Sequence, residues 1–422
     1  MKLPSLQIRR QRSWNVVIRY ALTSRLVEWV GLACLIATYL AGATARADSL
    51  QNWTVRQIPP PEGPWLAGHW DVTYGNGMFV AVGHKQWTDY GTIYSSPDGV
   101  NWTPWHDADP TLRINGELRR VIFADGKFMA VGWGYNTYTS QDGTNWMGFA
   151  NGPGIGFFQD VCFGQGKHVA IDGNMELSKS ILTSSDGRIW RRQAFARATR
   201  RIGFGGGRFV VACQSFTGTT TSFYWSSNGD NWFRAEIDFA LVPTGLTWGN
   251  GMFVAVGFKL GNPYTPTILT SPNGASWTPQ NPGVTNLLSS VECINGLFVA
   301  TGDSVILTST NGVNWDARTI TNNLARFAYG NGTLVGISGN SRWGQDLLQS
   351  DPLLHLAVAR ENPSEVGISG IQGTTIQIES ASDPSGPWQV LDTFPLSTSP
   401  YLWTDSTSPQ PPLRFYRANW SP

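Results

Sequence analysis

Aromatic and histidine side chains that could hold a ring-shaped ligand gather in a few short, non-repeating segments. These candidate ligand-binding residues are Trp65, His69, Trp70, His84, Trp87, Tyr90, Trp105, His106, Trp133, Tyr135 and Trp343. Aromatic faces stack on the C–H faces of sugar rings, while imidazoles and carboxylates bond to hydroxyl groups. The set predicts one ligand-binding face. The alternative is that the tryptophans pack structural joints and the histidines lie on the surface.

Carboxylates in the same segments could add catalysis. Asp89, Asp107 and Asp109 are the candidates, because a pair of carboxylates on either side of a glycosidic bond can hydrolyse it. The sequence contains no G-x-S-x-G, H-E-x-x-H, P-loop or dinucleotide fingerprint. No cysteine has metal-ligand spacing. We therefore expect neither a metal nor a cofactor.

The segments that carry these residues lie within or between the copies of a sequence pattern that recurs seven times. Its first copy spans 72–102 and contains Asn76-Gly77, the strand F-V-A-V-G at 79–83 and S-P-D-G-V-N-W at 96–102. The tryptophans that end the copies are Trp53, Trp102, Trp146, Trp190, Trp232, Trp277 and Trp315. Alternating apolar residues predict strands, and Asn-Gly or Asp-Gly pairs predict tight turns because these residues tolerate a positive φ. Four short strands in roughly 40–45 residues are typical of one β-propeller blade.

The two ends of the repeat region complement each other. The last copy, 327–351, has three strands and no terminal tryptophan, whereas 52–55 is a tryptophan strand with nothing before it. We therefore predict an all-β fold: a seven-bladed β-propeller over 48–352, closed by the N-terminal strand. Segment 52–56 should pair with 346–350, which leaves no open edge.

Charged residues recur where each first strand begins, next to the predicted central channel. The aligned positions are Asp71, Arg120, Asp160, Arg201, Gly245, Ser290 and Arg326. One interpretation is a ring of ion pairs at the channel mouth. The other is a site for an anionic ligand, because the planar guanidinium of arginine binds carboxylate in a bidentate manner.

The motif S-x-[DN]-G-x-[ND]-W is one residue shorter than the Asp-box of bacterial neuraminidase (BNR) repeats and resembles it. Such repeats occur in sialidases and in photosystem II assembly-factor propellers. The resemblance covers about 50–352 and implies a turn-forming role for Asp98, Asp142 and Asp186. In sialidases an arginine cluster binds the substrate carboxylate, which would correspond here to Arg120, Arg201 and Arg326. An F-R-I-P-type segment and a placeable tyrosine nucleophile with its glutamate are missing.

The N-terminal 1–47 has the features of a secretory signal peptide. Five arginines between 9 and 25 precede an apolar stretch at 30–43 and the small-x-small site Ala45-Arg46-Ala47. The alternative is a retained membrane anchor. Cleavage would move the formal net charge from +1 to −5. An acidic chain with 14% charged residues is a poor nucleic-acid binder. We expect a secreted, periplasmic or cell-surface monomer with no stable membrane insertion after cleavage.

The remaining features concern cysteines and the C-terminal region. Cys162, Cys213 and Cys293 are expected to be buried free thiols. Residues 353–422 contain short strands separated by Gly and Pro turns, which predict a small β-sandwich (Ig/fibronectin-like). Its R-F-Y-R segment at 414–417 resembles the end of C-terminal modules on secreted bacterial proteins. That resemblance implies an accessory or attachment role.

Three functions are consistent with these observations. The first is an exported propeller that binds a glycan or a protein partner through its variable-loop face. The second is a polysaccharide-active enzyme, a sialidase-like glycoside hydrolase or a lyase acting on acidic sugars. The third is an assembly or docking factor resembling the photosystem II assembly-factor propellers.

Overall fold

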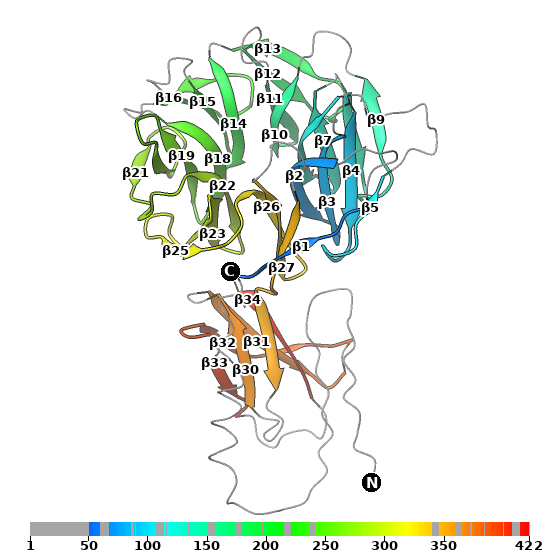
Figure 1. The fold of residues 1–422 in the computed structure, drawn as a ribbon, viewed down its shortest axis with the longest axis vertical. Helices are drawn as coiled ribbons and strands as arrows, with labels where there is room; N and C mark the ends of the chain where they lie inside the picture. Colours follow the sequence, from blue (N-terminus) through cyan, green and yellow to red (C-terminus); the bar gives the residue numbers. More distant parts are fainter. Residues whose placement is uncertain are drawn as a thin grey trace, which may run out of the picture. The chain divides into compact units, whose positions relative to one another are not determined.

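The computed structural model describes residues 50–59, 67–85, 88, 90–105, 114, 116–133, 136–150, 157–173, 179–195, 197–214, 221–235, 241–339, 346–358, 365–371, 374–383, 385–399, 401–406 and 414–421. Their regular secondary structure consists of β-strands (Figure 1). In this part of the chain no helix is long and apolar enough to cross a membrane. The predicted signal peptide, 1–47, lies outside the described residues. Two compact units are present, 53–349 and a second one that contains 350–422.

The first unit holds seven four-stranded antiparallel sheets. Blades 1 to 3 are formed by β2 (Ala67–Gly75), β3 (Met78–Lys85), β4 (Gly91–Ser96) and β5 (Thr103–Pro104); β6 (Leu118–Ala124), β7 (Lys127–Gly132), β8 (Asn136–Ser140) and β9 (Met147–Ala150); and β10 (Phe158–Gly164), β11 (Lys167–Asp172), β12 (Ser180–Ser184) and β13 (Arg191–Ala194). Blades 4 to 6 are formed by β14 (Ala198–Gly205), β15 (Arg208–Gln214), β16 (Thr221–Ser226) and β17 (Phe233–Arg234); β18 (Val242–Gly249), β19 (Met252–Lys259), β20 (Thr265–Ser271) and β21 (Thr278–Gln280); and β22 (Leu288–Ile294), β23 (Leu297–Gly302), β24 (Val305–Ser309) and β25 (Asp316–Thr319).

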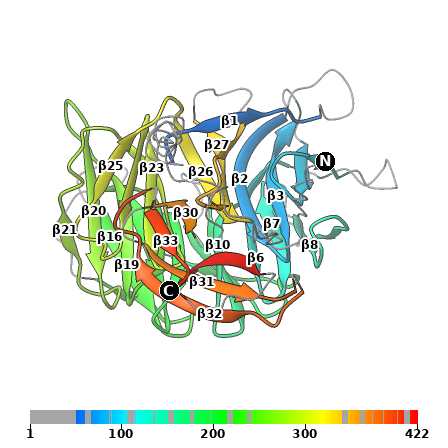
Figure 2. The same cartoon turned by 90° about the horizontal axis from the view of Figure 1, so that it is seen from below.

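The N-terminal strand completes blade 7, as the sequence predicts. β26 (Leu324–Gly330), β27 (Thr333–Ser338) and β28 (Leu347–Ser350) form a sheet whose fourth, outermost strand is β1 (Trp53–Arg56) (Figure 2). The Nε atom of Arg56 donates to Gln349 Oε1 at 2.8 Å across this pairing. The first strands of neighbouring blades contact one another around the centre, and β26 meets β2 (Figure 1). The seven-bladed propeller fold is therefore confirmed.

The recurring residues act locally on turns. Asn76 and Gly77 have φ values of 46° and 77°, the left-handed pair that a tight hairpin between β2 and β3 requires. In the S-x-D-G-x-N-W loop, Asp98 Oδ1 accepts backbone N–H bonds from Val100 and Asn101 at 2.8 Å. The Trp102 indole N–H donates to the Gly99 carbonyl at 3.1 Å. Each copy therefore closes its own turn, and side chains of the adjacent blade add bonds to it, as Gln349 Nε2 does to the Asp98 carbonyl at 2.9 Å.

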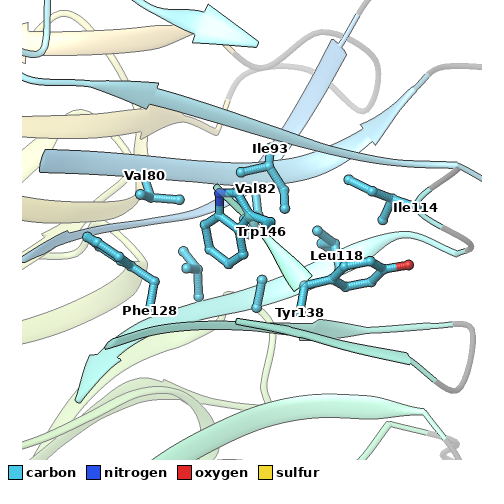
Figure 3. Close-up of a cluster of buried hydrophobic side chains, with 10 residues drawn as sticks. Val80, Val82, Ile93, Ile114, Leu118, Phe128, Tyr138 and Trp146 are labelled. Atoms are coloured by element: carbon cyan, nitrogen blue, oxygen red, sulfur yellow. The ribbon is translucent and has the colours of Figure 1, made fainter. Parts of the chain in front are cut away.

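Apolar side chains fill the space between blades. The cluster between blades 1 and 2 combines Val80 and Ile93 of the first with Phe128, Tyr138 and Trp146 of the second (Figure 3). These side chains are almost fully removed from solvent. The four terminal tryptophans of blades 1, 2, 3 and 5 are all buried. Burial of such large rings is the main source of stability in this unit.

The first strands share a β-bulge that shapes the channel mouth. The register of β2 against β3 shifts between His69 and Asp71, so Trp70 is an extra residue. The same shift occurs in every other blade, and in blade 2 the extra residue is Arg119. A bulge re-aims the side chain that it carries. The bulged residues thus lie next to the channel charges in sequence but face different surroundings.

The second unit contains two three-stranded sheets. Their orders are β29-β30-β33 and β32-β31-β34, with β29 (Leu354–Val358), β30 (Glu365–Gly370), β31 (Thr375–Ala381), β32 (Gln389–Pro395), β33 (Tyr401–Thr404) and β34 (Phe415–Ser421). One apolar cluster takes Val366 and Ile368 from one sheet and Ile376 and Ile378 from the other, as in a sandwich.

Candidate functional site at the channel mouth

An arginine stacked between two tryptophans marks the mouth of the channel beside blades 1 and 2. The guanidinium carbon of Arg119 lies 4.1 Å from the ring centroid of Trp70 and 4.8 Å from that of Trp133. Trp133 is 41% exposed, and its ring lies 5.2 Å from that of Phe157 in blade 3. Cation–π contacts of this kind fix the arginine side chain. We call Trp70, Arg119 and Trp133 the aromatic stack.

His84 and Glu117 hold the aromatic stack in place. The Trp70 indole N–H donates to His84 Nδ1 at 3.0 Å, and Arg119 forms an ion pair with Glu117 at 2.6 Å. Burial lowers the pKa of His84, an effect that Glu117 opposes and Arg119 reinforces. The histidine therefore stays neutral at neutral pH, which leaves Nδ1 free to accept the indole hydrogen bond.

Inside the mouth, three channel charges form one ion-pair group. Arg120 lies 3.1 Å from Asp71 and 2.9 Å from Asp160, and both carboxylates are almost fully buried. Asp71 also accepts the Val121 N–H at 2.8 Å. Burial alone would lower the pKa of Arg120, but Asp71 and Asp160 outweigh it and raise the pKa. Blades 1 to 3 thus neutralise Arg120 at the axis and leave one carboxylate charge in excess.

Blades 4 to 7 do not reproduce this neutralisation. Arg201 donates to the carbonyls of Thr244 at 2.5 Å and Arg200 at 2.8 Å. Within the described part of the chain, no carboxylate lies within ion-pair distance of Arg201 or Arg326. Burial lowers the pKa of Arg201 to about 9, and the nearby charge of Arg326 adds to the effect. The charge of Asp160 opposes the change at Arg201, and Glu292 lies near Arg326.

Sequence reasoning missed several residues of this site. Glu292 lies two residues after Ser290 on the same side of β22, and burial raises its pKa although Arg120 and Arg326 oppose the change. The alternation of side chains along a strand could have identified it. Arg119 and Phe157 gave no such signal, because their contacts cross from one blade to another.

The candidate ligand-binding residues divide among three surroundings. Trp70, His84 and Trp133 come together in the aromatic stack. His69 is buried, with its ring 5.4 Å from that of Tyr94, and Tyr90 is half-buried beside Gly116. Trp105 lines a separate cavity with Met78, and Met78 lies at the opposite end of β3 from His84. Trp105 itself lies beside Ile93, whose partner on β3 is Val82, two residues from His84.

Eight of the candidate residues are not among those that the structure describes. Trp65, Trp87, Asp89, His106, Asp107, Asp109, Tyr135 and Trp343 would include all three catalytic carboxylates, and they lie outside the described residues. Among the residues that are described, no three His, Cys, Asp or Glu side chains gather closely enough to hold a metal ion. Cys162, Cys213 and Cys293 are free thiols, and burial raises the pKa of each.

The S-x-D-G-x-N-W carboxylates hold turns and are not placed for chemistry. Burial disfavours the charged form of Asp142, but backbone N–H bonds from Asn145 and Thr144 outweigh it and lower the pKa. The N–H groups of Ile189 and Arg188 lower the pKa of Asp186 to about 2. Asparagines make the same bonds in blades 4 to 6, as Asn228 does with Asp230 and Asn231. A charge is therefore not required for this role.

The fold places this chain among the β-propellers, and comparison with solved structures agrees. A structure described as YCF48 bound to D1 peptide matches with a TM-score of 0.50 and 15% identity, covering 69% of this chain and 97% of that one. The Pan2 WD40 domain of Neurospora crassa matches with a TM-score of 0.51 and 11% identity, covering 72% and 96%. No family model matches the chain, and no curated protein matches it in sequence. At this identity the likeness shows the fold alone.

Proposed function

We propose that this protein is an exported β-propeller that binds an extended segment of a partner protein at its channel mouth. The observation that carries the proposal is the aromatic stack, fixed by its own hydrogen bond and ion pair. Rigid aromatic anchors next to a charged group are typical of the residues that dominate binding energy. One structural neighbour, YCF48, is described as bound to a peptide, which supports the same class of ligand.

The chemistry of the site favours binding over catalysis. Asp71 and Asp160 are both engaged by Arg120, so neither is available as a general acid or base. Arg119 and Trp133 can contact a peptide backbone and an apolar side chain at the mouth. Arg201 and Arg326 can accept a carboxylate, either of an acidic side chain or of a chain end. Export, which rests on the signal-like 1–47, is part of this proposal.

A peptide-display experiment tests this function. The mature protein is immobilised, random twelve-residue peptides are selected on it, and the affinity of each selected peptide is measured by fluorescence anisotropy. Trp133→Ala should weaken binding at least tenfold, the scale of one hot-spot residue. The matched control is Phe233→Ala, which removes an aromatic ring that is also exposed but lies on the outermost strand of blade 4.

The charge of the peptide separates the two parts of the site. A peptide that places its carboxylate between Arg201 and Arg326 should lose affinity when that carboxylate is amidated, and Arg201→Gln should then have no further effect. The proposal is wrong if no peptide is enriched, or if enriched peptides bind the Trp133 and Phe233 variants equally well.

A further inference from the structure

The joint between blades 1 and 2 contains a cavity near the outer strand. It has a volume of about 340 Å³, at the lower end of the range for small-molecule sites. Its described lining residues are Met78, Ser95, Pro97, Thr103, Pro104, Trp105 and Thr144. We call it the rim pocket. It is separate from the aromatic stack, so what it binds does not depend on the function proposed above.

Equivalent positions exist at the other joints because the strand register repeats. The Trp105 N–H donates to the Ile93 carbonyl at 2.8 Å. Ile93 lies two residues before Ser95 on β4, and Ser95 pairs with Thr103. In blade 2, Thr137 pairs with Phe149 and Thr139 with Met147, which makes Phe149 the counterpart of Trp105. By the same register the other counterparts are Gln193, Ala235, Gln280, Arg318 and Arg56.

At the two following joints, the next blade covers this position. The Arg188 guanidinium carbon lies 4.4 Å above the ring of Phe149. At the joint after that, Gln193 Nε2 donates to the Asp230 carbonyl at 3.1 Å. Arg188 and Asp230 each come directly after the glycine of the S-x-D-G-x-N-W loop in their own blade. Thr144 has the same place in blade 2, where it lines the pocket with Trp105. Thr144 is too short to cover the indole in the way that arginine covers Phe149.

In the remaining blades the same blade covers the position. The counterpart of Trp105 bonds to the counterpart of Ser95 in three blades: Gln280 to Thr270 at 2.9 Å, Arg318 to Thr308 at 2.6 Å, and Arg56 to Gln349 at 2.8 Å. In blade 4 the rings of Trp225 and Phe233 stack at 4.8 Å beneath Arg208. Among the described residues, Ser95 and Trp105 of blade 1 thus both line a cavity and have no such partner.

The lining chemistry selects the ligand. One indole face, two prolines and a methionine offer apolar contact, the hydroxyls of Ser95, Thr103 and Thr144 offer hydrogen bonds, and none of the seven described lining residues is charged. A peptide added as a further strand is disfavoured, because β5 has two residues and one is Pro104. We propose that the rim pocket binds one pyranose residue of a neutral glycan, with a sugar face on Trp105.

Three variants test this proposal. At the next joint an arginine, Arg188, covers Phe149. Thr144→Arg introduces an arginine at the equivalent position of this joint, so it should fill the pocket while Trp105 remains in place. Trp105→Ala removes the stacking face, and Phe149→Ala is its matched control because Arg188 already covers that ring. The probes are cellohexaose, xylohexaose, mannohexaose and maltohexaose, measured by titration calorimetry with the full mature chain.

We expect at least one probe to bind the wild type, and binding to fall at least tenfold in Thr144→Arg and Trp105→Ala but to stay within twofold in Phe149→Ala. The Trp133→Ala variant of the channel mouth should bind the sugar normally. The proposal is overturned if no neutral probe binds, or if Thr144→Arg binds as tightly as the wild type. Preference for short peptides over the sugars in the same assay would also overturn it.

Discussion

A single histidine in the core should make the stability of the propeller depend on pH. His168 occupies the position held by Phe79, Phe128, Phe209, Phe253 and Phe298 in other blades, and it is fully buried. Its ring lies 4.7 Å from that of Phe163, the same spacing as between Phe79 and Tyr74. Its ring nitrogens make at most a weak hydrogen bond to the backbone of Ser184. Phenylalanine should therefore fit this position without strain.

The size of the effect follows from the shifted pKa. Burial lowers the pKa of His168 to about 4, Lys127 adds to this, and Asp125, Asp186 and the backbone of Ser184 oppose it. The unfolded chain, with an ordinary histidine pKa near 6.5, then binds more protons than the folded protein between pH 6.5 and 4. Stability is fully present above pH 6.5 and falls as the pH drops through this window. At pH 4.5 the loss is about 2.5 kcal/mol.

Urea unfolding of wild type and His168→Phe at pH 7.5 and pH 4.5 measures this loss. At pH 7.5 the variant should be more stable by about 1–3 kcal/mol, since two unpaired buried nitrogens are removed. At pH 4.5 the advantage should grow by a further 2–3 kcal/mol or so. His168→Gln is the control: it should remove the part of the pH dependence that comes from His168, and leave that of His84, without the gain at pH 7.5. An advantage of the phenylalanine variant that is equal at both pH values would refute the reasoning.

Three further changes act on other parts of the scaffold. Trp190→Ala should destabilise by about 3–5 kcal/mol in urea unfolding, because the ring is 6% exposed and packs 4.9 Å from Phe158. Deleting 48–58 removes β1 from blade 7 and should lower the melting temperature by roughly 5–10 °C in a calorimetric scan. Arg120→Ala leaves Asp71 and Asp160 buried without a counter-ion and should cost about 3–5 kcal/mol at pH 7, less once those carboxylates are protonated.

Each of these expectations has an outcome that contradicts it. A loss below about 1 kcal/mol for Trp190→Ala would mean that the repeat tryptophans are not core residues. An unchanged melting temperature after the deletion would show that β1 does not hold the ring. If Arg120→Ala unfolds at the same urea concentration as the wild type, then solvent, and not Arg120, stabilises the charges of Asp71 and Asp160.

The fold could be predicted because the turns of each copy are set by bonds between residues a few positions apart. Asn76 and Gly77 set a turn, Asp98 closes the next, and Trp102 bonds back to Gly99. Such effects leave a periodic trace in the sequence. The pairing of β1 with β28 is the exception, since its partners are almost 300 residues apart. It was predictable because one terminal strand was missing at one end and present at the other.

The site was predictable in its residue types but not in its grouping. Trp70, His84 and Trp133 lie together in the aromatic stack, whereas Trp105 lies in the rim pocket, and only the strand register reveals this division. Arg119 escaped notice because a β-bulge directs it toward Trp70, and a bulge is a property of pairing between two strands rather than of one. Contacts between blades have no fixed spacing in sequence.

The two departures from the repeat, His168 and Thr144, differ in what surrounds them, and this difference yields a final prediction. His168 is buried, so its missing hydrogen bonds can only weaken the fold, and His168→Phe should raise stability without changing sugar affinity. Thr144 is exposed, so its short side chain leaves the Trp105 face open, and Thr144→Arg should abolish sugar binding without changing stability. Melting temperature and calorimetric titration of both variants measure the two quantities side by side. If Thr144→Arg destabilised the protein as much as Trp190→Ala, the pocket would be a required part of the core and not a place for a ligand.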